Sequence, residues 1–449
     1  MFPHKTPVCA LILSICLFCP VERAGAGTVQ DAPRPDLEAL SASAEKEVRG
    51  DILPFWIKNT RNTDNGGFVG LITADMKVKK GAPRGALLTS RILWTYSTAY
   101  RLYHDPAYLD MATYAYHDLV DHFWDKENGG LYWIIEADGT PKDTIKLIYG
   151  QVFGVYALSE YYRATGEKPA LEKAIAIYNL VEAHSRDRKN GGYLDVLDVH
   201  WARIPSDAKN PLGQAPKSQN SHIHILEAYT NLLRAWPDPV LRANQRDLFE
   251  MVATHIVDPK THHLILFMKE DWTPTSVAYP DEPGDRTSTP EDVSYGHDIE
   301  LSWLLVEAAE GLGDPALVAR AKAISLDIAR VTLAEGVEPD GSLVSDGGPK
   351  GYTDTNKEWW QQAEAAIGFM NAYQISGDGR YLTASLRSWD YIKAKFFDPQ
   401  GDWFNLLTRE GKPLPLPKVS LWKCPYHSSR SCFELIERVH ELLKSEAGR

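Results

Sequence analysis

The sequence predicts an all-α fold, an (α/α)6 barrel, which is a toroid of six helical hairpins with short β-hairpins in the connecting loops. The first observation behind this prediction is a repeated phrase. Its three clearest copies are NTDNGGFVGLI (62–72), DKENGGLYWII (125–135) and DRKNGGYLDVL (187–197). The second observation is a constant spacing, since Asn65, Asn128 and Asn190 stand 63 and 62 residues apart. Self-similarity at a fixed period is typical of repeat architectures.

Weaker echoes extend the repeat to six units. They read DPKTHHLILFM, EPDGSLVSDG and DPQGDWFNLL. Helical patterns such as MATYAYHDLVDHFW, VFGVYALSEYYRATG and ALEKAIAIYNLVEAHS lie between the copies. An open solenoid would need polar terminal caps, which the sequence does not offer, whereas six hairpins that close on themselves need none. We therefore predict a single barrel domain from about residue 36 to 449.

The first residues predict a secretory signal peptide, assigned to 1–26. His4 and Lys5 precede the apolar run VCALILSICLF, and the small residues of ERAGAG follow. The run is too short to span a bilayer, and an uncleaved anchor is the alternative. We expect an exported, periplasmic protein with no membrane partner once the signal is removed.

Charge and cysteine content narrow the classes of partner. The formal net charge of −12 disfavours nucleic acid or an anionic membrane surface. Three of the five cysteines lie in the signal peptide, which leaves Cys424 and Cys432. These two could form a disulfide or be small buried hydrophobic residues, and they are too few for a structural zinc site.

The stretch SQNSHIHILEAYTNLLRAW (218–236) predicts a helix that is apolar almost all round. One narrow stripe is polar, and it contains Asn220, His224, Glu227 and Asn231. A surface helix would have a wide polar face, so this stripe predicts groups that line an internal cavity. A buried polar network between helices is the alternative. His222 lies on the far side of the helix and cannot share a metal with His224.

The stretch SYGHDIELSWLLVEAAEGLG (294–313) repeats this pattern, with His297 and Glu300 one turn apart at the start of a helix. A helix N-terminus disfavours an imidazolium, whereas a nearby carboxylate favours it. We therefore expect His297 to titrate near neutrality and to exchange protons. A capping histidine beside a surface glutamate is the alternative.

Three further helices carry candidate ligand-binding groups. KEWWQQAEAAIGFMNAYQISGD places Trp360 and Glu364 one turn apart, and an aromatic face beside a carboxylate suits a sugar ring, although core packing is common for tryptophan. Arg91 lies inside an apolar run, where it needs a partner or a ligand. Tyr149 and Gln151 begin KLIYGQVFGVYALSEYY and would either bind a ligand or complete the hairpin.

Near the C-terminus, VSLWKCPYHSSRSCFELIERV places Trp422, Cys424 and His427 before an amphipathic pattern. The chain contains no Gly-rich phosphate loop, no H-E-x-x-H and no G-x-S-x-G. No feature therefore calls for a nucleotide, metal or flavin cofactor. The residues favour cofactor-independent acid–base chemistry by histidine, with Cys424 as a packing residue.

Several long motifs together resemble the cellobiose 2-epimerase branch of the N-acylglucosamine 2-epimerase superfamily. They are NSHIHILEAYTNL, GHDIELSWLL, WWQQAEAAIGFMNAY and WKCPYHSSRSC, in this order. The resemblance covers essentially the whole chain after the signal peptide. It implies an (α/α)6 barrel that inverts C2 of the reducing-end glucose or mannose in β-1,4-linked disaccharides, without a cofactor, and in some members also isomerises aldose to ketose.

The resemblance also implies roles for particular residues. His297 and His427 match the acid/base pair, His224 assists them, and Asn220 orients the substrate. The other implied substrate contacts are Arg91, Tyr149, Glu300, Trp360 and Trp422. The chain departs from the family pattern in its export signal and in Ser428, where asparagine is common, so the preferred disaccharide stays open among cellobiose, mannobiose and lactose.

Other classes remain open at this point. A glycoside hydrolase or polysaccharide lyase could use the same fold, and a hydrolase would need two opposed carboxylates from among Glu227, Glu300 and Glu364. A non-catalytic oligosaccharide receptor is a third class. We expect a monomer that acts on a small disaccharide.

Overall fold

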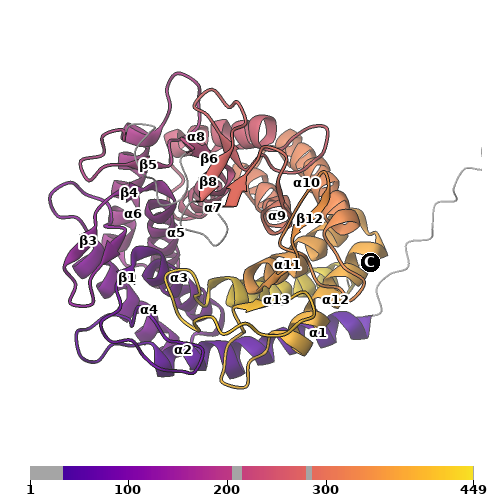
Figure 1. Ribbon diagram of the computed structural model, residues 1–449, viewed down its shortest axis with the longest axis horizontal. Helices are drawn as coiled ribbons and strands as arrows, with labels where there is room; N and C mark the ends of the chain where they lie inside the picture. The colour runs from indigo at the N-terminus through magenta and orange to yellow at the C-terminus, as the bar shows by residue number, and fades with distance from the viewer. Residues whose placement is uncertain (1–33, 205–214, 280–285, 448–449) are drawn as a thin grey trace, which may run out of the picture.

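The computed structural model describes residues 34–204, 215–279 and 286–447, which form a ring of helix pairs (Figure 1). The predicted signal peptide lies outside these residues. The inner helices surround the centre of the ring, and each contacts the next, with the last against the first. They are α3 (Ala86–Tyr103), α5 (Ile148–Thr165), α7 (Gln219–Ala235), α9 (Tyr295–Leu312), α11 (Trp359–Ser376) and α13 (Tyr426–Ala447).

An outer helix packs against each inner helix, so the predicted (α/α)6 barrel is confirmed. In ring order from α13, the outer helices are α1 (Arg34–Glu47), α4 (Pro106–Asp118), α6 (Lys168–Leu180), α8 (Pro239–Met251), α10 (Pro315–Glu335) and α12 (Gly379–Lys395). The short α2 (Leu53–Asn59) follows α1. π-helical turns extend four of the outer helices at Val48–Ile52, Leu119–Phe123, Val181–Ser185 and Val252–Ile256.

Local sequence explains where these helices begin and end. Asp238 and Asp314 each accept hydrogen bonds from backbone N–H groups of the next helix, and each is followed by a proline that suits the first turn. Gly166, Gly313 and Gly377 end inner helices in the left-handed conformation that glycine adopts without strain. No helix within residues 34–204, 215–279 and 286–447 is long and apolar enough to cross a membrane.

Short antiparallel strands connect neighbouring repeats at one end of the barrel. The pairs are β1 (Arg84–Gly85) with β2 (Ile134–Ile135), β4 (Lys146–Leu147) with β5 (Val196–Leu197), β6 (Lys217–Ser218) with β7 (Phe267–Met268), β10 (Val293–Ser294) with β11 (Asp346–Gly348), and β13 (Lys357–Glu358) with β14 (Leu406–Leu407). A bridge between Ile72 and Val419 joins the first repeat to the last. Further strands extend the hairpins: β3 (Pro141–Asp143), β8 (Val277–Tyr279), β9 (Arg286–Ser288) and β12 (Gly351–Asp354).

The repeated phrase forms the turn of each hairpin. Within the described residues, all six predicted copies close through a bridge, from Arg61–Phe68 in the first to Phe397–Trp403 in the last. Gly129 has a φ of +74° and Gly191 a φ of +78°, a conformation that glycine adopts without strain, and His262 takes it in the fourth copy with a φ of +64°. The predicted six-fold repeat is therefore confirmed as a repeat of structure.

A buried ion pair fastens several of these turns to the following inner helix. In the third repeat, Lys217 lies directly before α7, and its Nζ donates to Asp187 Oδ2 at 2.9 Å and to the carbonyl of Gly191 at 2.6 Å. Lys146 binds Asp125 at 2.8 Å in the same way. Because these strand residues precede the inner helices, the ion pairs set where each inner helix begins.

Replacing Lys217 with methionine should destabilise the protein by about 3 kcal/mol, because Asp187 would be left buried without its counter-charge. Urea denaturation measures the change in the free energy of unfolding. Lys80→Met is the matched control, since Lys80 pairs with Asp64 at the surface and should contribute little. Equal effects of the two substitutions would contradict this account.

Candidate active site

All nine residues to which the family resemblance assigns a role line one cavity of about 380 Å³, hereafter the barrel cavity. They are Arg91, Tyr149, Asn220, His224, His297, Glu300, Trp360, Trp422 and His427. The cavity lies at the end of the barrel where the inner helices begin. The sequence did not predict five further lining residues, which are Glu358, Asn405, Leu406, Leu416 and Ser420. Trp359 also lines the cavity, beside Trp360.

The first turns of the inner helices explain why these side chains converge. The sixth residues of α3, α7, α9 and α11 are Arg91, His224, Glu300 and Glu364, and they come from different repeats at the same level of the barrel. Side chains at equal depth on helices in a closed ring point toward a common centre. A repeat-by-repeat alignment of the inner helices would have predicted this polar layer.

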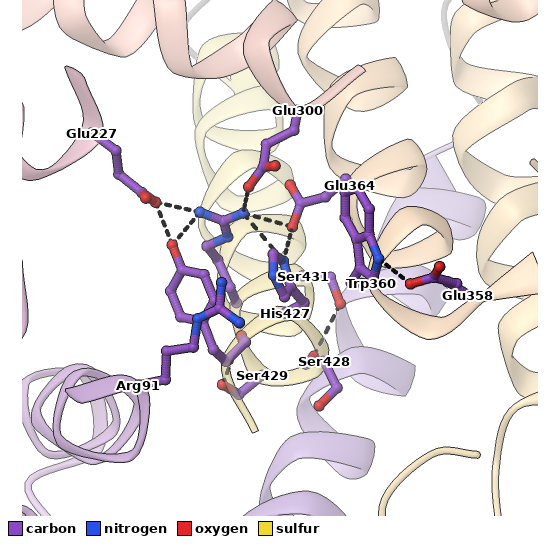
Figure 2. Close-up of polar contacts among 12 residues, drawn as sticks. Arg91, Glu227, Glu300, Glu358, Trp360, Glu364, His427, Ser428, Ser429 and Ser431 are labelled. Atoms are coloured by element: carbon purple, nitrogen blue, oxygen red, sulfur yellow. Dashed lines mark hydrogen bonds and ion pairs between the residues drawn. The ribbon is translucent and has the colours of Figure 1, made fainter. Parts of the chain in front are cut away.

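A buried guanidinium forms the floor beneath the cavity. Arg430, on α13, donates from Nη2 to Glu364 at 2.7 Å and to Glu300, and from Nη1 to Glu227. The three glutamates converge on this point from three different helices (Figure 2). Tyr426 donates its hydroxyl to Glu227 as well. An arginine has enough donors in a fixed plane to bind several carboxylates at once.

His427 projects from the first turn of α13 and is held by one of these glutamates. Its Nδ1 lies 2.8 Å from Glu364 Oε1 (Figure 2). Burial, together with the positive charges of Arg91 and Arg430, holds the pKa of His427 well below its usual range. The neutral imidazole therefore donates its Nδ1 proton to the carboxylate, and its Nε2 lone pair is left to act as a base.

His297 lies on α9, and its imidazole, like that of His427, is close to the cavity-lining indole of Trp360. The ring centre of Trp360 is 4.8 Å from that of His297 and 5.6 Å from that of His427. Burial lowers the pKa of His297 to about 3, and the charge of His224 adds to the shift. The expectation that His297 titrates near neutrality is therefore wrong, because burial of the imidazole disfavours its charged form. Its Nδ1 lies 2.9 Å from the hydroxyl oxygen of Ser294.

The remaining acidic groups differ in protonation. Burial raises the pKa of Glu300 to about 7, and the neighbouring charge of Glu364 adds to this. Burial would also raise the pKa of Glu227, but Arg430 and the hydrogen bond from His224 lower it to about 2. His224 Nδ1 lies 2.9 Å from Glu227 Oε2. The floor therefore holds one firmly ionised carboxylate and one that exchanges a proton near neutral pH.

Glu300, Glu364 and His427 also lie close enough together to bind a metal ion. The guanidinium of Arg430 already contacts both carboxylates, and the Nδ1 of His427 is bonded to Glu364. Arginine is thus the positive partner of this group.

Arg91 and Tyr149 form the opposite wall. Arg91 donates from Nη2 to the Tyr149 hydroxyl at 2.7 Å and lies 3.8 Å from Cys424 Sγ. Cys424 and Cys432 are both buried and free, so they form no disulfide, and Cys424 packs behind the arginine. The Oδ1 atom of Asn220 has no hydrogen-bond partner in the described residues although it is buried, so it is available to a ligand hydroxyl.

The indole rings of Trp360 and Trp422 differ in how firmly the protein holds them. Glu358 accepts a hydrogen bond from the indole N–H of Trp360 at 2.5 Å, which fixes the ring (Figure 2). Trp422 keeps 41% of its surface exposed at the cavity mouth, beside Tyr149, so one face is open to a ligand.

Some sequence interpretations need correction. Of the polar stripe on α7, only Asn220 and His224 line the barrel cavity. Glu227 lies beneath the cavity, bound to Arg430, and Asn231 lines a different cavity at the far ends of the inner helices. A stripe of several turns spans more depth than the cavity has.

Two side chains near the cavity have structural roles. Gln151 completes a hairpin by bonding both backbone groups of Leu131. The hydroxyl of Ser428 donates to Asp402 Oδ1 at 3.2 Å, and Ser428 does not line the barrel cavity.

Comparison with known proteins now identifies the family. The model of the N-acylglucosamine 2-epimerase family matches residues 66–430. The chain belongs to this family. It is 40% identical over 404 residues to a cellobiose 2-epimerase of Bacteroides fragilis, which covers 89% of this chain and 99% of the relative. A cellobiose 2-epimerase of Dictyoglomus turgidum is 37% identical over 90% of this chain and all of the relative.

Solved structures agree. The cellobiose 2-epimerase of Bacillus thermoamylovorans superimposes with a TM-score of 0.81 at 34% identity, covering 89% of this chain and 100% of that chain. The chain is therefore a carbohydrate 2-epimerase, which is an isomerase. A GH76 α-mannanase at 12% identity shares only the fold, with a TM-score of 0.58.

The histidine pKa values can be tested in the ligand-free enzyme. Because the pKa of His297 is lowered to about 3 and that of His427 is also depressed, both imidazoles should stay neutral as the pH falls from 7 to 5. Nitrogen-15 NMR of labelled histidine measures this directly, with His297→Ala and His427→Ala to assign the signals. A midpoint near 6.5 for either residue would contradict the effect of burial.

Proposed function

We propose that the protein interconverts reducing-end glucose and mannose in β-1,4-linked disaccharides, converting cellobiose to glucosyl-mannose. The observation that carries the proposal is the placement of His297 and His427 in one cavity, on different helices and each close to the ring of Trp360. Inversion at a carbon requires that a proton leave one face and return to the other. Two imidazoles on different helices can supply both events without a cofactor.

The reaction begins when the ring opens to expose the C1 aldehyde. His427 Nε2 is suited to take the C2 proton, because the resulting imidazolium is stabilised by the carboxylate of Glu364. The electron pair from the C–H bond moves into a cis-enediolate. His297, protonated in the complex with substrate, then delivers its proton to the opposite face of C2 and is left neutral. His427 returns its proton to solvent before the next turnover, and the roles exchange in the reverse reaction.

The enediolate needs donors at O1 and O2. Arg91 and His224 line the cavity beside Asn220, and the charge of the arginine is aimed at the same space. Donors fixed before the reaction stabilise developing negative charge without reorganisation. We assign Arg91, Asn220 and His224 to the two oxygens, and Tyr149 and Glu300 to neighbouring hydroxyls.

A disaccharide suits the two tryptophans. The fixed ring of Trp360 lies beside both histidines and would hold the reacting sugar, while the exposed ring of Trp422 at the mouth would hold the second one. The cellobiose 2-epimerases among the relatives support this substrate class. Mannobiose epimerisation and aldose–ketose isomerisation use the same enediolate and are the alternatives within the family.

The three glutamates named for a hydrolase do not form an opposed pair. Glu227, Glu300 and Glu364 all bind Arg430, so these three do not face each other across the cavity. We further propose, from the N-terminal sequence pattern, that the enzyme is exported to the periplasm. We also propose that it acts there as a monomer. Cell fractionation and size-exclusion chromatography test these two points.

Substituting His297 or His427 with alanine should lower epimerisation of cellobiose by about 10³-fold, because each removes one of the two proton-transfer groups. Product analysis by chromatography and mass spectrometry measures the rate and shows whether the product keeps the disaccharide mass. Circular dichroism checks that the variants fold.

His200→Ala is the control, since His200 is exposed and bonds to the Asn128 side chain away from the cavity. It should keep normal activity. Near-normal activity in either cavity variant would reject the two-histidine scheme, and release of glucose by the wild type would favour hydrolysis.

A further inference from the structure

A second cavity, of about 530 Å³, lies beside the turn of the fourth repeat. We call it the hairpin cavity, and its lining includes Asp258, Thr261, His262 and Val293. It is separate from the barrel cavity, with which it shares no lining residue. The same place in the second and third repeats shows what the hairpin cavity lacks.

In the second and third repeats, a lysine and a tryptophan fill this place. The Nζ of Lys217 binds Asp187 and lies 4.3 Å from the ring centre of Trp272, whose indole N–H donates to the carbonyl of Asn190 at 2.8 Å. One repeat earlier, Lys146 binds Asp125, and Trp201 donates to Asn128 at 3.1 Å. An ammonium and an aromatic ring thus cover each turn together.

The fourth repeat has lost both side chains. Val293 occupies the position in the fourth repeat that Lys217 occupies in the third. Each begins the strand before an inner helix and pairs with a strand of the next hairpin, Val293 with Gly347 and Lys217 with Met268. Four residues beyond these partners stand Gly351 and Trp272, both at positive φ. Nothing lies within 4 Å of the point where a Cβ of residue 351 would be. Val293 lines the hairpin cavity, and so do Gly348 and Pro349 of the turn that leads to Gly351.

The acceptors that bind the lysine and indole in the other repeats are still present. Asp258 corresponds to Asp187, and its Oδ1 accepts the backbone N–H of Lys260 at 2.7 Å, as the turn requires. Its Oδ2 accepts no hydrogen bond from the described residues, and neither do the carbonyls of Thr261 and His262, which correspond to those of Asn190 and Gly191.

No cation of the described wall residues forms an ion pair with Asp258. His263 bonds to Asp298 at 2.6 Å and to Glu335 at 3.1 Å, and Arg330 pairs with Asp327 at 3.5 Å. Lys260 also lines the cavity but is exposed. Glu291 and Asp292 add further acidic groups. The carboxylate of Asp258 and the carbonyls of Thr261 and His262 therefore lie in the wall of the hairpin cavity without a cationic partner from the described residues.

We propose that the hairpin cavity binds an organic primary ammonium ion, whose NH3+ group takes the place of the missing lysine on Asp258 and whose attached ring or chain fills the space of the missing indole. The ammonium donates to the Asp258 carboxylate and to the carbonyl of His262, as Lys217 donates to Asp187 and Gly191. The site is independent of the epimerase activity.

Tryptamine is the probe, because it carries an ammonium and an indole in one molecule. Isothermal titration calorimetry with the full chain should show tryptamine binding at least about tenfold more tightly than indole-3-ethanol, its uncharged counterpart. Equal binding of the two compounds, or no binding of tryptamine at up to about 10 mM, would overturn the proposal.

Two variants locate the site. Val293→Lys supplies the missing ammonium from within the chain, so it should weaken tryptamine binding at least about tenfold and raise the thermal midpoint. Asp258→Asn should weaken binding by a similar factor while epimerisation stays within about twofold of normal, and it decides the matter if Val293→Lys does not fold. Glu291→Gln, in the same wall, is the control and should bind normally. Unchanged binding by Asp258→Asn would refute the site.

Discussion

The buried guanidinium of Arg430 is the interaction on which the rest of the site depends. It is fully enclosed and binds Glu227, Glu300 and Glu364, which come from three inner helices. Desolvation of so many charges is costly, and removing one partner would leave the others unpaired. Arg430 lies on α13, the last helix, so the carboxylates gain their shared counter-charge only when the ring has closed. Ring closure and assembly of the site are thus one event.

The same cluster sets the chemistry of the histidines. Glu364 holds His427 and Glu227 holds His224, so each imidazole is oriented from behind by a carboxylate that Arg430 fixes in turn. Burial keeps His297 and His427 neutral in the empty cavity, which suits a base that must accept a proton from carbon. The acidic floor then stabilises the imidazolium once it forms. Burial therefore disfavours the charged imidazole before the reaction, and the carboxylates stabilise it once the proton has been transferred.

Much of this arrangement could be predicted from the sequence, because a repeat fixes the order of the helices around the ring and the level of equivalent residues along the barrel axis. The NGG phrase predicted six hairpins, and polar residues in otherwise apolar helices predicted the lining of the barrel cavity. The helical wheel failed for Glu227 and Asn231, since it reports direction and not depth. Arg430 was missed because the C-terminal motif drew attention to Trp422, Cys424 and His427 before the amphipathic pattern, whereas α13 already begins at Tyr426 and contains Arg430.

The pKa values could not be predicted in the same way, because they depend on burial by residues far apart in the chain. A helix N-terminus and a nearby glutamate indicated a histidine that titrates near neutrality, whereas enclosure by the whole ring lowers the pKa of His297 to about 3. Likewise, Trp359 and Glu358 line the cavity from positions that the helical pattern assigns to packing and to the helix start.

The central claim is that His297 and His427 each serve one face of C2, and hydrogen exchange in heavy water tests it most directly. Each alanine variant would be incubated separately with cellobiose and with its C2 epimer, and deuterium at C2 would be measured by NMR. The account predicts that each variant exchanges the C2 hydrogen of one epimer only, that the two variants choose opposite epimers, and that neither interconverts them. Exchange of both epimers by a single variant would contradict it.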